Sequence, residues 1–150
     1  MSAADSDSLQ ASVGAFVRAF GLLDRERTPC GLDLHVSEAH LIGDLSSEGP
    51  LGQKELSERL HLSKSTVSRL VTQLIGRGWV QRTPDVADGR AVLVSLTSSG
   101  HDVADRLGRA RARRFQELLA AIPEGRRAAV IEGVGHLADA ACSARQRVHS

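Results

Sequence analysis

Two short amphipathic helices in close succession constrain the fold more than any other feature of this chain. The first opens at Gly52-Gln53-Lys54-Glu55, with Leu56 and Leu60 facing inward, and only His61-Leu62 separates it from the second. Ser63 is a good N-cap for the second helix, whose apolar stripe is formed by Val67, Leu70, Val71, Leu74 and Ile75. Its opposite face is short, polar and basic. The pair predicts a helix-turn-helix, a motif whose second helix enters the major groove of DNA.

A β-hairpin is predicted directly after the second helix. Gly76-Arg77-Gly78 ends that helix, and extended runs follow from Trp79 to Thr83 and from Ala91 to Leu96. The connection from Pro84 to Gly89 is rich in turn-forming residues. Trp79, the only tryptophan, is expected to pack in the core. A hairpin in this position supplies a wing whose tip can lie along the neighbouring minor groove.

Four further helices flank this module in the sequence. Apolar residues at helical spacing predict the first from about Leu9 to Arg25, and Ser37 is expected to cap the second. Thr97 is expected to cap a long fifth helix, which Pro123 interrupts before a sixth. The order ααααββαα predicts a mainly α fold with a small β-hairpin wing, in which a winged helix-turn-helix is joined to a helical region.

The candidate DNA contacts lie on the second helix of the motif and at the wing tip. Lys64 and Arg69 are the strongest candidates for base-edge or phosphate contact, within a set that comprises Ser63, Lys64, Ser65, Thr66, Ser68, Arg69 and Gln73. In the wing, Arg90 is expected to enter the minor groove while Asp88 orients its guanidinium by a charge-assisted bond. Further candidates for backbone contact are Gln53, Lys54, Arg77 and Arg82.

Two of these backbone candidates have an equally good structural explanation. Arg77 could serve as a positive charge at the C-terminal end of a helix, and Arg82 could keep a strand edge in solution. The charge distribution agrees with DNA contact by the middle of the chain. Residues 51–90 hold seven Lys or Arg against four acids, whereas residues 1–50 hold three Arg against eight acids. A basic middle segment is what phosphate contact requires.

The stretch from Leu51 to Thr97 resembles the winged helix of the MarR (multiple antibiotic resistance regulator) family over its whole length, and the helices outside it occur in the same order. Asp88-Gly89-Arg90 matches the Asp-x-Arg signature of the family's wing. Many members carry a basic residue at the middle position, where this chain has Gly89. The resemblance implies that Arg90 serves the minor groove and that one additional phosphate contact is lost.

The resemblance also implies a domain organisation and a mechanism. Residues 1–150 would form one MarR-like domain, with the DNA-binding region at 37–100 and a helical dimerisation region at 9–36 and 101–147. A homodimer would repress transcription at a pseudo-palindromic operator in double-stranded DNA until a small-molecule effector releases it. Apolar stripes on the terminal helices support a dimer independently, because they are too long for one winged helix to bury.

Sensing chemistry of two other kinds stays open. Peroxide-sensing relatives use cysteines, which makes Cys30 and Cys142 redox candidates, although the chain has no tyrosine to surround a thiolate. Zinc-sensing relatives use Cys, Glu and His, and the local ingredients here are Glu26, Cys30, His35, His40 and His101. No pair among them has HxxxH or CxxC spacing, so neither a metal nor another cofactor is expected.

Other classes of protein are less well supported by the sequence. No GxSxG elbow, phosphate loop or HExxH motif is present, so an enzyme is not expected. A winged helix that binds protein instead of DNA remains an alternative. Uncharged stretches fall far short of the roughly 20 apolar residues that a membrane-spanning helix needs. The first residues lack the layout of a secretion signal, and a cytoplasmic location without membrane contact is expected.

Overall fold

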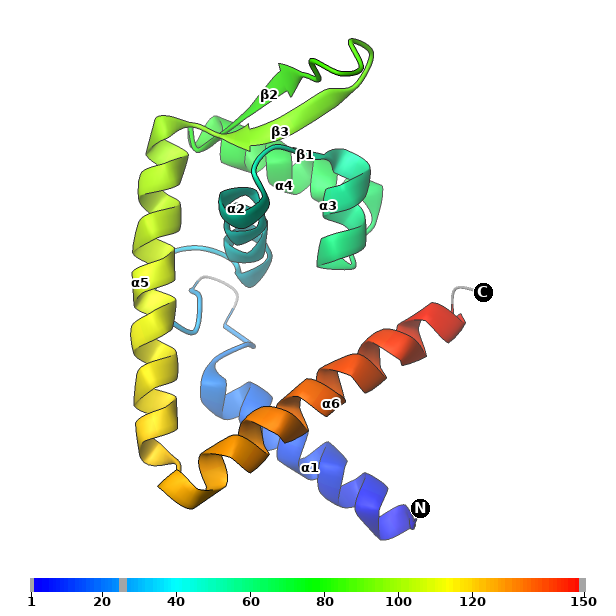
Figure 1. Ribbon diagram of the computed structural model, residues 1–150, viewed down its shortest axis with the longest axis vertical. Coiled ribbons are helices and arrows are strands. Elements are labelled where there is room, and N and C mark those ends of the chain that lie inside the picture. Colours follow the sequence, from blue (N-terminus) through cyan, green and yellow to red (C-terminus); the bar gives the residue numbers. More distant parts are fainter. Residues whose placement is uncertain (1, 25–26, 149–150) are drawn as a thin grey trace. The chain divides into compact units, whose positions relative to one another are not determined.

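The computed structural model describes residues 2–24 and 27–148, which divide into two compact units, Met1–Arg111 and Ala112–Ser150. The elements follow the order α1, α2, β1, α3, α4, β2, β3, α5 and α6 (Figure 1). The prediction of a mainly α fold with a β-hairpin wing is confirmed. No helix in the described residues is long and apolar enough to cross a membrane.

Helix α1 spans Ala3–Phe20 and differs at both ends from the predicted range of 9–25. It begins earlier because Ser2 and Asp5 form a capping box, in which the Asp5 N–H donates to Ser2 Oγ at 3.3 Å and the Ser2 N–H donates to Asp5 Oδ2 at 3.1 Å. It ends earlier because Gly21 adopts a left-handed conformation with φ of 87°. The predicted end at Arg25 lies outside the described residues.

Helix α2 spans Val36–Glu48, and its N-cap is His35, so the prediction of Ser37 as the cap is wrong. The Glu38 carboxylate accepts a hydrogen bond from the His35 N–H at 2.9 Å. This bond satisfies an N–H donor at the start of the helix, and it places the N-cap two residues before Ser37. Gly49 ends the helix.

The predicted helix-turn-helix is formed by α3, Gln53–Leu60, and α4, Lys64–Gly76. Glu55 caps α3 by accepting from the Gly52 N–H at 2.9 Å. His61 turns the chain between the helices in a left-handed conformation with φ of 53°. Ser63 is the N-cap of α4, as predicted.

The wing belongs to a three-stranded antiparallel sheet of order β1-β3-β2. Strands β2, Val80–Pro84, and β3, Val92–Leu96, form the predicted hairpin, and the loop between them projects away from the helices (Figure 1). Strand β1, Leu51–Gly52, pairs with the other side of β3 and was not predicted. It fixes the start of α3 to the sheet.

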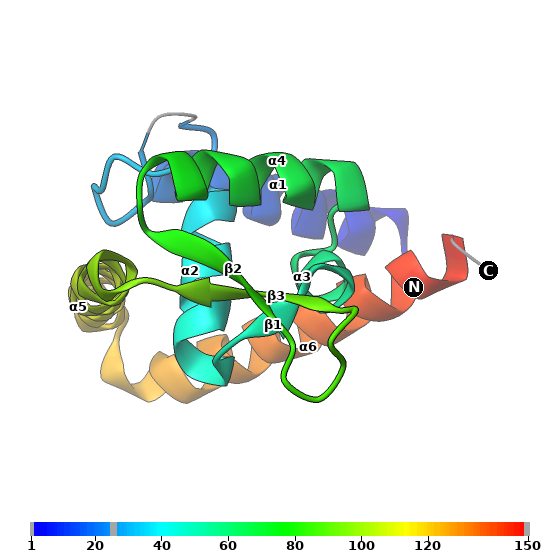
Figure 2. The same cartoon turned by 90° about the horizontal axis from the view of Figure 1, so that it is seen from above.

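The core of the first unit joins the helix-turn-helix to the sheet and to the first half of α5, Ser98–Ala121. Most of its buried residues come from α2, α3, α4, β3 and α5, and include Leu41, Ile42, Leu45, Leu56, Val67, Val71, Leu74, Val94 and Leu107. Seen from above, α4 lies along the outside of α2 and α3, with the hairpin beside it (Figure 2). The apolar stripe of α4 therefore faces inward, and its polar face is left outside.

The start of α5 is held against the wing by Thr97 and Gly100. Thr97 caps the helix as predicted, because its Oγ1 accepts from the Gly100 N–H at 3.1 Å while donating to the Gly78 carbonyl at 2.6 Å. A Cβ on Gly100 would lie 1.9 Å from the Trp79 carbonyl oxygen, so only glycine permits this approach. Pro123 separates α5 from α6, Glu124–Val148, as predicted.

Candidate DNA interface

The beginning of α4 is organised by the hydroxyl of Ser63. Its Oγ accepts from the Thr66 N–H at 3.2 Å and lies 2.8 Å from Thr66 Oγ1 and 3.0 Å from Ser65 Oγ. Ser63 and Ser65 are exposed, and Thr66 is half-buried. The three predicted contact residues thus form one hydroxyl cluster, in which Ser63 also has a structural role as the cap.

A hydrogen bond joins the first turns of the two helices. Gln53 Nε2 donates to the Lys64 carbonyl at 3.3 Å, which ties the start of α3 to the start of α4. Lys54, the next predicted candidate, is exposed and lies 3.8 Å from Glu58 Oε1 through its Nζ. An exposed pair of this kind contributes little to stability, so it leaves the Lys54 ammonium available.

The outward face of α4 presents unneutralised positive charge. Lys64, Arg69 and Gln73 are exposed, whereas Ser68 is half-buried and its carbonyl accepts from Thr72 Oγ1 at 2.9 Å. Within residues 2–24 and 27–148, no carboxylate lies at ion-pair distance from the Lys64 ammonium or the Arg69 guanidinium. Both cations are free to meet an external anion.

At the wing tip, Asp88 does not hold the Arg90 guanidinium as predicted. Its Oδ1 accepts from the backbone N–H of Arg90 at 3.1 Å, and Asp85 Oδ1 accepts from the Ala87 N–H at 2.9 Å. An aspartate side chain reaches the N–H two residues on more easily than it reaches the end of an arginine. Asp88 therefore shapes the loop, and Arg90 stays exposed with no ion pair among the described residues.

The remaining backbone candidates, Arg77 and Arg82, have different surroundings. Arg82 is exposed on β2, opposite Val94 of β3. Arg77 follows the last residue of α4, and its Nη1 lies 3.9 Å from Glu38 Oε2 and 3.4 Å from the Asp33 carbonyl oxygen. Its guanidinium also stands over the Trp79 ring, 4.8 Å from the centroid. Trp79 is half-buried and packs against the core, as predicted.

The redox and metal candidates belong to elements other than the helix-turn-helix and the wing. Cys30 is half-buried, with its Sγ 3.0 Å from Thr28 Oγ1, and Cys142 is exposed on α6. In the described part of the chain, no three His, Cys, Asp or Glu residues gather closely enough to hold a metal ion. Glu26, one of the predicted ingredients, lies outside the described residues. Redox sensing by either cysteine stays a prediction.

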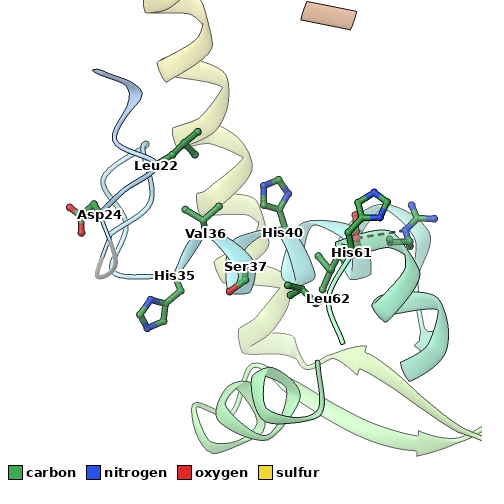
Figure 3. A pocket seen from close by; sticks show the side chains of 11 residues that line it. Leu22, Asp24, His35, Val36, Ser37, His40, His61 and Leu62 are labelled. Carbon is green, nitrogen blue, oxygen red and sulfur yellow. Dashed lines mark ion pairs between the residues drawn. The ribbon is translucent and has the colours of Figure 1, made fainter. Parts of the chain in front are cut away.

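A cavity of about 600 Å³ opens beside the start of α2 and the end of α3 (Figure 3). The segment after α1 contributes Leu22 and Asp24, α2 contributes Val36 and His40, and the α3–α4 turn contributes His61. Burial lowers the pKa of His40, and the Arg111 charge lowers it further, while Asp44 opposes the shift. No sequence pattern indicates this cavity, because its lining comes from three separated segments.

A smaller cavity of about 310 Å³ lies beside the α1–α2 connection. It is lined by residues from that connection, by Trp79 and by the start of α5: Gly31, Leu32, Asp33, Leu34, Trp79, Val103 and Arg106. Residues 31–34 line this cavity, and the next three residues, 35–37, line the larger one. This segment also contains the carbonyl that Arg77 contacts.

A helix-turn-helix followed by a three-stranded wing, with two free cations on the outer helix, defines a winged helix-turn-helix protein. The family model described as "MarR family" matches residues 34–92. The HTH-type transcriptional regulator YxaD of Bacillus subtilis is 31% identical over 104 residues, which cover 69% of this chain and 72% of YxaD. The chain belongs to the MarR family, as predicted.

Two other relatives extend the comparison. The HTH-type transcriptional regulator Mb0904 of Mycobacterium bovis is 30% identical over 92 residues, which span 61% of this chain but only 64% of that relative. Among solved structures, the PcaV transcriptional regulator of Streptomyces coelicolor, in complex with its natural ligand, has a TM-score of 0.64 and 28% identity. That match covers 91% of this chain and 90% of PcaV.

Proposed function

We propose that this protein is a DNA-binding transcriptional regulator that acts as a homodimeric repressor and is released by a small molecule. The observation that carries the proposal is the exposed face of α4, where Lys64 and Arg69 have no ion-pair partner in the described residues. An α-helix fits the major groove of B-DNA, and arginine is the residue that most often reads guanine there. We also propose a cytoplasmic location for it.

The wing extends the same surface. Arg90 belongs to the loop between β2 and β3, which projects from the sheet (Figure 1), and the residue is exposed. A narrow minor groove concentrates negative potential, which favours an inserted guanidinium. Lys54 and Arg82 add charge for contacts with phosphate. Lys64 and Arg69 would read the major groove, and Arg90 would anchor the adjacent minor groove.

Dimerisation is supported by the exposed apolar side chains of α1 and α6. All of α1 is described and none of its residues is buried, although it carries Leu9, Val13 and Phe16. On α6 none of the residues whose exposure is described is buried, and Val130, Ile131, Val134 and Leu137 are exposed. We propose that these faces pair with a second copy, with the dimerisation region at residues 9–36 and 101–147 and the DNA-binding region at 37–100.

The experiment that tests DNA recognition is selection from random duplexes with the purified protein, followed by sequencing. We expect enrichment of an inverted repeat whose half-sites are separated by about one helical turn, roughly 10 base pairs. Arg69→Ala should abolish the enrichment and Arg90→Ala should weaken it. Arg109→Ala is the matched control, because it removes an exposed arginine from α5 that lies outside both contact elements.

The result that would contradict the proposal is also specific. If wild type enriches no sequence and all three variants retain the same residual binding, the winged helix does not read DNA. A protein-binding module would then be the better account.

The cavity of about 600 Å³ is our candidate for the effector site. Its volume lies within the range of small-molecule pockets, and PcaV was solved with its natural ligand. A ligand that binds better to a dimer whose two DNA-binding regions are differently spaced would shift the population away from the DNA-binding form. A metabolite library screened by thermal shift should yield compounds that raise Tm and also displace the operator. Compounds that stabilise the protein without displacing DNA would argue against release.

A further inference from the structure

A buried carboxylate lies close to the end of the recognition helix α4. Glu38 is 1% exposed, and its Oε2 accepts from the His35 N–H. An ionised carboxylate is costly to bury unless a positive charge and hydrogen bonds compensate it. The cation that faces it is Arg77, whose Nη1 is 3.9 Å from the same oxygen. Glu38 therefore gives Arg77 a fixed partner inside the protein.

Three contacts restrain the Arg77 side chain from different directions. Besides Glu38, its Nη1 donates to the carbonyl of Asp33 at 3.4 Å, and its guanidinium lies 4.8 Å from the centre of the Trp79 ring. An arginine stacked on an aromatic ring while it meets a carboxylate uses both its flat face and its donors. Arg77, the residue immediately after α4, is thus joined to Asp33 and Glu38 on one side and to Trp79 on the other.

These contacts hold one end of a short, rigid element. Helix α4 has 13 residues, which at 1.5 Å per residue correspond to a length of about 20 Å. Its N-terminal end is tied to α3 by the bond from Gln53 to the Lys64 carbonyl. Its C-terminal end is tied to the start of α2 by Arg77. A helix fixed at both ends keeps Lys64 and Arg69 at one angle to the groove.

We propose that Arg77 is a positioning residue for DNA recognition: it fixes the angle of α4 through Glu38, Asp33 and Trp79 and does not contact phosphate. The proposal rests on the function proposed above and replaces the sequence prediction of Arg77 as a backbone contact. A phosphate contact would need the guanidinium to leave a buried carboxylate that has no other ion-pair partner among the described residues.

The test compares Arg77→Ala, Arg77→Lys and Glu38→Gln with wild type and with the control Arg109→Ala. Trp79 is the only tryptophan, so its fluorescence reports this cluster without DNA. Arg77→Ala and Glu38→Gln should both shift the Trp79 emission and raise its quenching by acrylamide, whereas Arg109→Ala should leave both unchanged. Circular dichroism shows whether each variant is folded.

Binding is then measured on the operator that wild type selects and on an unrelated duplex, over a series of salt concentrations. We expect Arg77→Ala to weaken operator binding by about 5- to 150-fold, because a misaligned α4 would lose the equivalent of one base contact by Lys64 or Arg69. Binding to the unrelated duplex and the salt slope should stay at wild-type values. Glu38→Gln should weaken operator binding too, although removal of a negative charge would by itself strengthen it. The double variant should be no weaker than Arg77→Ala, because both changes break one pair.

A phosphate contact would give the opposite pattern. Arg77→Ala would then weaken both duplexes alike and reduce the salt slope by about 0.9, and Arg77→Lys would restore binding because a lysine keeps the charge. A wild-type level of operator binding by Glu38→Gln would likewise overturn the proposal. A wild-type protein that selects no operator would instead refute the proposed function, while the fluorescence result would still show whether the cluster exists.

Discussion

The winged helix and the terminal helices use their apolar residues in opposite ways. In the winged helix, α2, α3 and α4 bury theirs among themselves and against β3 and the first half of α5. In α1, and in the described part of α6, apolar residues at helical spacing stay exposed. The first region has a core of its own, whereas we propose that the exposed side chains of these helices meet a second copy of the chain. On that proposal, the same helical periodicity marks a core in one place and an interface in the other.

The sharpest way to test this contrast is to truncate one leucine in each region. Leu74 of α4 is fully buried, so Leu74→Ala should lower the free energy of unfolding by about 2–5 kcal/mol. Leu137 of α6 is 36% exposed. On dilute protein, Leu137→Ala should lower the free energy of unfolding by less than half of the loss caused by Leu74→Ala. Urea denaturation followed by circular dichroism measures both values. Equal losses would mean that α6 has a core of its own.

A charge on the exposed face of α6 tests the interface itself. Ile131 is 61% exposed, and Ile131→Asp should raise the dissociation constant of the dimer by more than about tenfold, because a carboxylate cannot be buried in an apolar contact without a partner. Light scattering over a range of concentrations measures the mass. Glu132→Asp, a change of an exposed acid beside it, is the control. An unchanged mass would place the interface elsewhere.

The joint between the wing and α5 offers a smaller effect. Thr97→Ala removes a helix cap and the bond to the Gly78 carbonyl, and should cost about 1 kcal/mol of unfolding free energy. Thr97→Ser keeps the hydroxyl and should retain most of the stability. Thermal denaturation of the three proteins measures the difference. If the serine variant loses as much as the alanine variant, the methyl group and not the bond is responsible.

The smallest effect concerns pH. The pKa of His40 is lowered in the folded protein, mainly by burial, so the unfolded chain binds more protons between that lowered value and the ordinary value of 6.5. The contribution of neutral His40 to the free energy of unfolding is therefore present above pH 6.5 and is lost as pH falls below that value. His40→Asn should show a flatter decline of stability between about pH 7 and 5. Urea midpoints across this range provide the measurement, and parallel curves would contradict the assignment.

Sequence patterns predicted the features that depend on neighbouring residues. The cap at Ser63, the hairpin after Gly78 and the break at Pro123 follow from local chemistry, because each needs only residues a few positions away. Strand β1 escaped prediction because a two-residue strand has no periodicity and exists only through pairing with β3. The cap at His35 escaped because histidine is not a preferred cap, and the side chain of Glu38 supplies the bond.

The candidate site shows the same limit. The outward face of α4 was predictable, since helical periodicity alone separates Lys64 and Arg69 from the buried stripe. The contacts that a long side chain makes were not predictable. Arg77 meets Asp33 and Glu38, which are about 40 positions away in the chain, and Asp88 bonds to a backbone N–H instead of to the guanidinium of Arg90. Tertiary contacts decide such cases.

The bonds inside the wing loop also bear on the entropy of association. Asp85 and Asp88 hold residues 85–91 in shape through bonds to the main chain, and the Asp85 N–H donates to the Ala91 carbonyl at 2.9 Å. If Arg90 enters the minor groove as proposed, these bonds order the loop backbone in advance, and the main further cost is immobilising the Arg90 side chain, about 0.5–1.5 kcal/mol. A wing built in this way would give up little conformational freedom on binding, which favours affinity.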